Sequence, residues 1–160
     1  LTPEAVCYDI GCGSGSISVE MAMLSPGIRV YAIDSVEEAV ALTRKNADRF
    51  GLKNVQVVQG MAPEGMEDFP EPTHAFIGGS RGNMAAILKN LYAKNPSMRV
   101  VINAISLETL SEIMGCLKTW KVTDLDITQV QISKAKTLGD YHMMMGQNPV
   151  TIVSFQFTSN

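Results

Sequence analysis

Short β-rich runs alternate with helical stretches along most of this 160-residue chain. The runs span residues 5–10, 29–33, 55–58, 75–77 and 99–102, and the helical stretches span residues 17–24, 36–50, 83–92 and 107–117. Strands that alternate with helices are typical of a parallel sheet with crossover helices. The alternation therefore predicts an α/β fold, and the length favours one domain over residues 1–160.

The pattern changes after Trp120. Two further β-rich runs, residues 122–133 and 150–157, follow each other with no helix between them. Because strands without a crossover helix pair antiparallel, we expect these runs to pair through the connection at residues 134–149. The sequence thus predicts a mostly parallel sheet that ends in an antiparallel C-terminal hairpin.

Composition excludes several classes of protein. With 46% hydrophobic and 18% charged residues and a net charge of −3, the chain is not disordered. It lacks the run of about 20 apolar residues that a membrane helix needs and the pattern of a secretory signal, so we expect a cytoplasmic protein with no membrane partner. The pI of about 5.3 disfavours a nucleic-acid partner. Three cysteines without a CxxC pair indicate reduced thiols, and we expect no metal site.

The most informative segment is a glycine-rich turn after the first run, Asp9-Ile10-Gly11-Cys12-Gly13-Ser14-Gly15-Ser16. Glycines let the backbone turn sharply and let a ligand approach the main chain. The third glycine follows the second by two positions rather than three, which disfavours NAD or FAD. The turn also lacks the Lys-Ser or Lys-Thr pair of a P-loop.

Asp34 directly follows the second run, 19 residues after Gly15. That offset is close to the one at which an acidic side chain reaches the ribose hydroxyls in folds of this type. A glycine turn together with this acid fits S-adenosylmethionine, which has a ribose and an amino-acid moiety but no pyrophosphate. The alternative interpretation is structural: a plain strand-to-helix turn, with Asp34 as a helix N-cap.

Beyond this turn, several stretches resemble one family of class I S-adenosylmethionine-dependent methyltransferases. The stretches are the turn continued to Glu20, Gly60-Met61-Ala62-Pro63-Glu64, Phe76-Ile77-Gly78-Gly79-Ser80 and Gln147-Asn148-Pro149-Val150-Thr151. In order and spacing they are similar to the decarboxylating precorrin C15-methyltransferases of cobalamin biosynthesis. These enzymes occur alone or as the C-terminal half of precorrin-6Y C5,15-methyltransferase. The resemblance covers essentially the whole chain.

The resemblance implies a Rossmann-like, seven-stranded sheet with helices on both faces, and a homotetramer. It implies methyl transfer to C15 of a precorrin or cobalt-precorrin, with loss of carbon dioxide from the acetate side chain on ring C. Five residues would line the methionine end of the cofactor: Gly11, Cys12, Gly13, Ser14 and Gly15. Asp34 would hold the ribose, and Ala62 would lie against the adenine.

The chain departs from the family pattern at two positions. Met61 stands where the family usually has Asp, which removes a hydrogen-bond acceptor near the adenine, and His74 stands where Asp is common. Family members also carry an upstream segment with a Thr near the cofactor. Because residue 1 is Leu rather than Met, we expect this chain to lack that N-terminal segment.

Two side chains are candidates for the chemistry. Arg81, in the loop at residues 78–83, could pair with an acceptor carboxylate, or could be a solvated arginine at a helix start. His142, next to Tyr141, could donate a proton, or could be a loop histidine without a role. Similar pairs of interpretations apply to Lys134 and Lys136 (carboxylate contacts or surface lysines) and to the methionines at 143–145 (a cover for a flat macrocycle, or core or interface packing).

Three other functions remain open from the sequence. A methyltransferase acting on amino groups of RNA or DNA bases would carry Asn/Asp-Pro-Pro-aromatic where this chain has Ile77-Gly78-Gly79-Ser80. A small-molecule O-methyltransferase is comparable. A non-catalytic module that binds S-adenosylmethionine is the third alternative, motivated by Met61 and by the missing upstream segment.

Overall fold

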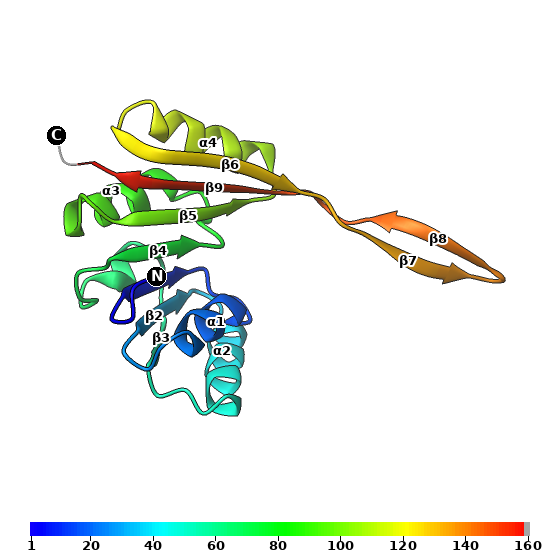
Figure 1. The fold of residues 1–160 in the computed structure, drawn as a ribbon, viewed down its shortest axis with the longest axis horizontal. Coiled ribbons are helices and arrows are strands. Elements are labelled where there is room, and N and C mark those ends of the chain that lie inside the picture. The colour runs from blue at the N-terminus through cyan, green and yellow to red at the C-terminus, as the bar shows by residue number, and fades with distance from the viewer. Residues whose placement is uncertain (159–160) are drawn as a thin grey trace.

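The computed structural model describes residues 1–158 and consists of one large sheet, its helices and a projecting two-stranded arm (Figure 1). The elements in chain order are β1 (Val6–Ile10), α1 (Ser16–Met23), β2 (Arg29–Asp34), α2 (Glu37–Arg49), β3 (Val55–Gln59), the 3-10 turn η1 (Glu64–Met66), β4 (His74–Ile77), α3 (Met84–Lys94), β5 (Arg99–Ala104), α4 (Leu107–Leu117), β6 (Val122–Val130), β7 (Ser133–Leu138), β8 (Tyr141–Gly146) and β9 (Val150–Phe157). Every strand and helix predicted before residue 120 is present, with its ends shifted by at most two residues.

The large sheet has seven strands in the order β3-β2-β1-β4-β5-β9-β6. The pairs among β1 to β5 are parallel, whereas β9 runs antiparallel to both β5 and β6. The strand order reverses beside β1, so the loops after β1 and β4 lie next to each other at the carboxyl edge. Open α/β sheets bind ligands at such a switch point. The predicted mostly parallel, seven-stranded sheet is confirmed.

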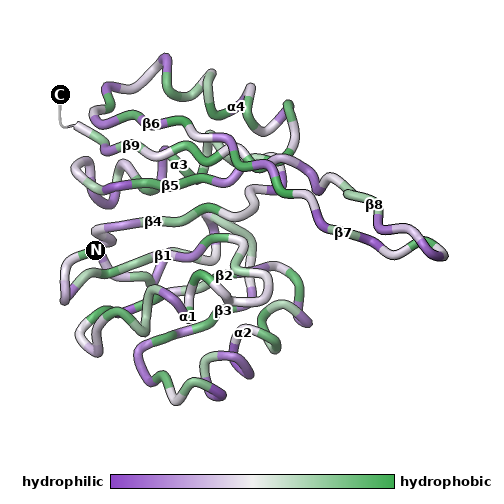
Figure 2. The backbone as a smooth tube through the Cα atoms, turned by 45° about the vertical axis from the view of Figure 1, so that its right-hand side comes forward, coloured by the Kyte–Doolittle hydropathy of each residue, from purple (hydrophilic) through white to green (hydrophobic). Residues whose placement is uncertain are grey.

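Helices lie on both faces of the sheet, as predicted. Alternate residues of β1 point to opposite layers: Cys7 packs with Ala22 of α1, whereas Tyr8 and Ile10 belong to the larger core with Ile87 of α3. All of β1 is buried, but in β4, β5 and β9 buried residues alternate with half-buried ones. In that half of the sheet, helices therefore bury only one face. Hydrophobic segments follow the central strands in Figure 2.

The C-terminal part differs from the prediction in one respect. The run predicted as residues 122–133 ends at Val130 and pairs antiparallel with β9, as expected. The connection at residues 134–149 is not a loop, however, because it forms the antiparallel hairpin of β7 and β8, here called the arm. The arm extends beyond the sheet from the ends of β6 and β9 (Figure 1), and its side chains are exposed on both faces.

Among the described residues, no helix has both the length and the apolar character needed to cross a membrane.

Candidate functional site

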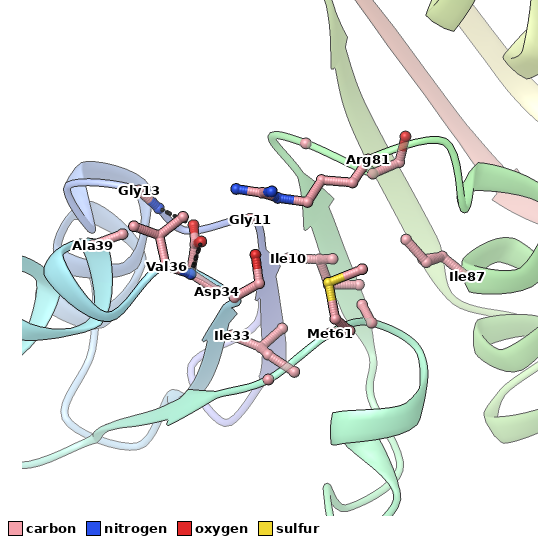
Figure 3. Close-up of a pocket in the computed structure, with 15 residues that line it drawn as sticks. Ile10, Gly11, Gly13, Ile33, Asp34, Val36, Ala39, Met61, Arg81 and Ile87 are labelled. Carbon is pink, nitrogen blue, oxygen red and sulfur yellow. Dashed lines mark hydrogen bonds between the residues drawn. The ribbon is translucent and has the colours of Figure 1, made fainter.

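A pocket of about 300 Å³ opens at the carboxyl edge of the sheet, where the strand order reverses (Figure 3). Four loops build it, each following a parallel strand. The residues that these loops contribute are Gly11 and Gly13 after β1, Asp34 and Ser35 at the end of β2, Gly60, Met61 and Ala62 after β3, and Gly79, Ser80 and Arg81 after β4. The volume lies at the lower end of the range for small-molecule sites.

Asp34 is fixed in this pocket by two backbone donors. The N–H of Gly13 donates to Asp34 Oδ2 at 3.0 Å, and the N–H of Val36 donates to Oδ1 at 3.0 Å. These are the dashed contacts in Figure 3. A carboxylate has about four acceptor sites, so each oxygen can accept a further hydrogen bond. The carboxylate is thus held in one orientation at the pocket wall, ready for two hydroxyl donors.

The three glycines of the turn have different physical roles. A Cβ on Gly11 would lie 2.8 Å from both the N and the O of Gly79, so Gly11 lets the loops after β1 and β4 touch. A Cβ on Gly15 would lie 2.6 Å from the Thr43 side chain on α2, so Gly15 lets two helices pack closely. Only Gly13 has open space in this direction. Of the three, Gly13 is the one whose missing side chain leaves room for a ligand.

Three of the five predicted ligand residues in the turn, Cys12, Ser14 and Gly15, do not line the pocket. Cys12 is buried, and its Sγ accepts a hydrogen bond from Thr43 Oγ1 at 3.4 Å. Burial raises the pKa of this thiol to about 11, so it is a protonated packing residue. Ser14 is exposed, and its carbonyl accepts a hydrogen bond from Asn46 of α2 at 2.8 Å. Direct ligand contacts of Cys12, Ser14 and Gly15 stay predictions.

Asp9 lies beneath the turn and is 1% exposed. Its Oδ2 accepts a hydrogen bond from Ser18 of α1, but Oδ1 has no partner among the described residues. Burial, assisted by the nearby charge of Asp34, raises the pKa of Asp9 from 3.8 to about 6. The folded protein therefore keeps this proton at pH values where the unfolded chain has lost it, and the free energy of unfolding falls as pH rises from about 4 to about 6.

Replacing Asp9 with Asn is expected to stabilise the fold near neutral pH. The gain in unfolding free energy is up to about 3 kcal/mol at pH 7.5, because one pKa unit corresponds to about 1.4 kcal/mol, and it disappears toward pH 4. Urea unfolding across this pH range measures it. Asp48→Asn, at an exposed position on α2, is the control. A gain of equal size at every pH would contradict the assigned role of burial.

Sequence reasoning missed Ser35 as a member of the site. Ser35 lines the pocket, and its Oγ is buried and has no hydrogen-bond partner among the described residues. A buried hydroxyl without a partner is costly, and a ligand in the pocket could satisfy it. The only available signal was its place directly after Asp34. Met61 also lines the pocket, beside Ala62. The position at which this chain has Met in place of the Asp of the family pattern therefore lies within the site.

Arg81 lines the same pocket as Asp34 and comes from the loop after β4. Its backbone has φ = 50°, which is strained for a residue with a side chain. Figure 3 shows the side chain reaching from the loop after β4 toward Gly13 and Asp34, but no ion pair within 4.0 Å joins it to any described carboxylate. The structure therefore brings one cation, without an acidic partner, to the mouth of the pocket.

His142, the other candidate for the chemistry, lies outside the pocket, as do His74 and Glu20. His142 pairs with Thr137 in the arm, outside the pocket. His74 begins β4 and so lies at the amino ends of the parallel strands, away from the pocket. Burial lowers its pKa, and its Nδ1 lies 2.9 Å from Thr73 Oγ1. Glu20 is exposed on α1. No group of three or more His, Cys, Asp or Glu side chains among residues 1–158 is placed to hold a metal ion.

Comparison with known proteins places this architecture among precorrin enzymes. Residues 1–157 match the family model described as "Precorrin methyltransferase domain". A protein of Pyrobaculum calidifontis named "probable cobalt-precorrin-6B C(15)-methyltransferase (decarboxylating)" is 36% identical over 151 residues, which are 93% of this chain and 77% of that protein.

Two solved structures have the same fold over nearly the whole chain. The precorrin-6y C5,15-methyltransferase of Geobacter metallireducens superposes with a TM-score of 0.85 at 33% identity, covering 98% of this chain and 82% of that one. A precorrin 8w decarboxylase of Methanobacterium thermoautotrophicum superposes with a TM-score of 0.81 at 36% identity, covering 94% and 81%.

Proposed function

Because this chain belongs to the precorrin methyltransferase domain family, we propose that it methylates C15 of a precorrin or cobalt-precorrin with S-adenosylmethionine and releases carbon dioxide from the ring C acetate. The names of its relatives support this reaction. The observation that carries the proposal to this chain is the Asp34 carboxylate, which the Gly13 N–H holds in place at the wall of an open pocket.

The residues present fit S-adenosylmethionine. Asp34 would accept hydrogen bonds from the two ribose hydroxyls, and Ser35, which lines the same pocket, would supply a further polar contact. The open space beside Gly13, just ahead of the N-terminus of α1, suits the methionine carboxylate, because the positive end of a helix favours anions. Met61 and Ala62 would cover the adenine with apolar and polarisable contacts instead of a carboxylate.

The proposed reaction does not need a nucleophilic side chain. When bound, S-adenosylmethionine would supply an electrophilic methyl group to the acceptor carbon, with S-adenosylhomocysteine as the leaving group. When carbon dioxide leaves, the electron pair of the broken bond enters the conjugated macrocycle. The chain therefore orients two reactants and excludes water. The raised thiol pKa of Cys12 agrees with this, since a covalent role would need a thiolate.

Turnover with both substrates tests the proposal. S-adenosylhomocysteine should accumulate only when the protein, S-adenosylmethionine and a precorrin-6B or cobalt-precorrin-6B acceptor are all present. A protein that binds S-adenosylmethionine but produces no S-adenosylhomocysteine with either acceptor would instead be the non-catalytic module.

Within this proposal, Arg81 binds a carboxylate of the acceptor. Replacing Arg81 with Gly should raise the acceptor KM about tenfold, because a guanidinium pairs with carboxylate in a charge-assisted contact. The same change relieves the strain at φ = 50°, so the melting temperature should stay equal or rise. Steady-state kinetics and thermal unfolding measure the two effects.

Arg81→Lys separates the two contributions, since it keeps the charge and the backbone strain but loses the forked donor geometry. It should show an intermediate KM and no gain in stability. An unchanged acceptor KM for Arg81→Gly would exclude Arg81 from acceptor binding.

We also infer self-association, with a homotetramer as the expected state. A two-stranded hairpin is marginally stable alone in water, yet the arm exposes Tyr141, Met143, Met144 and Met145 by 44–75%. Contact with further copies of this chain would cover part of this apolar surface. Sedimentation velocity at micromolar concentration measures the state, and a single monomeric species would contradict the inference.

A further inference from the structure

A second cavity lies where the arm joins the sheet. We call it the neck groove, and it is lined by Val130, Ile132, Lys134, Gln147, Asn148, Val150 and Ile152. Its volume is about 390 Å³. It shares no lining residue with the pocket around Asp34. The lining consists of four aliphatic side chains, one cation and two amide side chains.

The neck groove faces the same edge of the sheet as the Asp34 pocket. β9 is antiparallel to β5, with Thr151 opposite Ala104, so β9 begins where the parallel strands end. β6 is antiparallel to β9, so its last residue, Val130, lies at this edge too. In Figure 1 the arrowheads of β4 and β5 point to the side from which the arm leaves.

The distance between the Asp34 pocket and the neck groove suits one large acceptor. From β1 to β9 the sheet advances by three strands, through β4 and β5, which is roughly 15 Å at the usual strand spacing. A macrocycle with its reacting carbon at the mouth of the Asp34 pocket would cover the ends of β4 and β5. Its far side would then reach the neck groove.

The charges on the arm are also suited to such a ligand. Lys134 pairs with Met145 across the hairpin and Lys136 pairs with Met143, so these four side chains share one face. Residues 128–138 and 141–152 contain no Asp or Glu. This face therefore offers two cations and two polarisable thioethers without competing carboxylates. A flat conjugated ring with carboxylates at its rim matches both features.

We propose that the neck groove and the face of the arm with Lys134 and Lys136 bind the polycarboxylate tetrapyrrole acceptor. The aliphatic groove takes one edge of the ring, and the two lysines pair with its carboxylates. This inference rests on the proposed function, since it locates the second substrate of that reaction. The opposite face, with Ala135 and Met144, has no charged side chain and is free to pack against another copy.

Uroporphyrin III, a planar tetrapyrrole with carboxylates around its rim, is a suitable binding probe. The double variant Lys134→Gln/Lys136→Gln should bind it about tenfold more weakly than the wild type, because two exposed ion pairs together contribute about 1–2 kcal/mol. The matched control is Lys118→Gln/Lys121→Gln, which removes the same charge from exposed positions around the end of α4. Its affinity should change by less than about twofold. The pair Lys134→Arg/Lys136→Arg should restore binding.

Kinetics then separate this inference from the proposed function. The variant Lys134→Gln/Lys136→Gln, here called the neck variant, should raise the KM for the precorrin by a similar factor and leave the dissociation constant for S-adenosylmethionine unchanged. Three results would each overturn the proposed acceptor site at the neck groove, here called the neck site. They are an equal loss of porphyrin affinity in both glutamine variants, no loss of affinity in the neck variant, and no porphyrin binding by the wild type. If the wild type still forms S-adenosylhomocysteine with the acceptor in those cases, the proposed function stands and only the neck site fails.

Discussion

Replacing Asp34 with Ala should weaken S-adenosylmethionine binding by at least about a hundredfold. The carboxylate would accept two ribose hydroxyl donors, and each hydrogen bond to a charged group contributes about 1.5–3 kcal/mol, where 1.4 kcal/mol is tenfold in affinity. The change also frees the N–H groups of Gly13 and Val36, which now donate to Asp34. Titration calorimetry on the folded variant gives the dissociation constant directly.

Glu38→Ala is the matched control for this experiment. It removes the same charge from an exposed position in the first turn of α2, four residues away. Its affinity for the cofactor should equal that of the wild type. If the two variants lose affinity equally, the effect is one of overall charge, and Asp34 is an N-terminal cap rather than the ribose ligand.

Gly11→Ala is expected to have the largest effect on the stability of the fold. The new Cβ would meet the backbone of Gly79 at 2.8 Å, in a residue whose φ is +72°. Left-handed strain of about 1–2 kcal/mol adds to overpacking of about 1–3 kcal/mol. The expected loss is therefore about 3 kcal/mol, measured by urea unfolding. Because Gly11 and Gly79 both line the pocket, cofactor affinity should fall as well.

Gly51→Ala isolates the strain contribution. Gly51 follows α2 with φ = +66°, but nothing lies within 4 Å of its missing Cβ. This variant should lose only about 1–2 kcal/mol and keep its cofactor affinity. If Gly11→Ala is no more destabilising than Gly51→Ala, the loops after β1 and β4 separate freely, and the close contact between them is not needed for the site.

Most of the fold follows from hydrophobic periodicity and from glycine positions. The buried strands of a parallel sheet are short apolar runs, and each was found to within two residues before Trp120. The arm was missed because neither of its strands is buried, so no hydrophobic pattern marks it. A local signal was present, however. Gly139-Asp140 forms a two-residue turn with Gly139 at φ = 61°, and such a pair between extended segments predicts a hairpin.

The site was predictable at the level of loops, but less so at the level of single side chains. The spacing of the turn and of Asp34 placed both at one edge, where the structure finds the pocket. The sequence could not distinguish a glycine that admits a ligand from one that admits a neighbouring loop or helix. That distinction depends on long-range contacts, such as those of Gly11 with Gly79 and of Gly15 with Thr43.

The most direct test of the proposed reaction is the mass of its tetrapyrrole product. The protein is incubated with S-adenosylmethionine and cobalt-precorrin-6B, or with precorrin-6B, and the product is examined by mass spectrometry. We predict a product that has gained one methyl group in place of hydrogen and lost one molecule of carbon dioxide. A product that gains the methyl group but keeps all its carboxylates would contradict the decarboxylating reaction, and an unmodified acceptor would contradict the proposed methyl transfer itself.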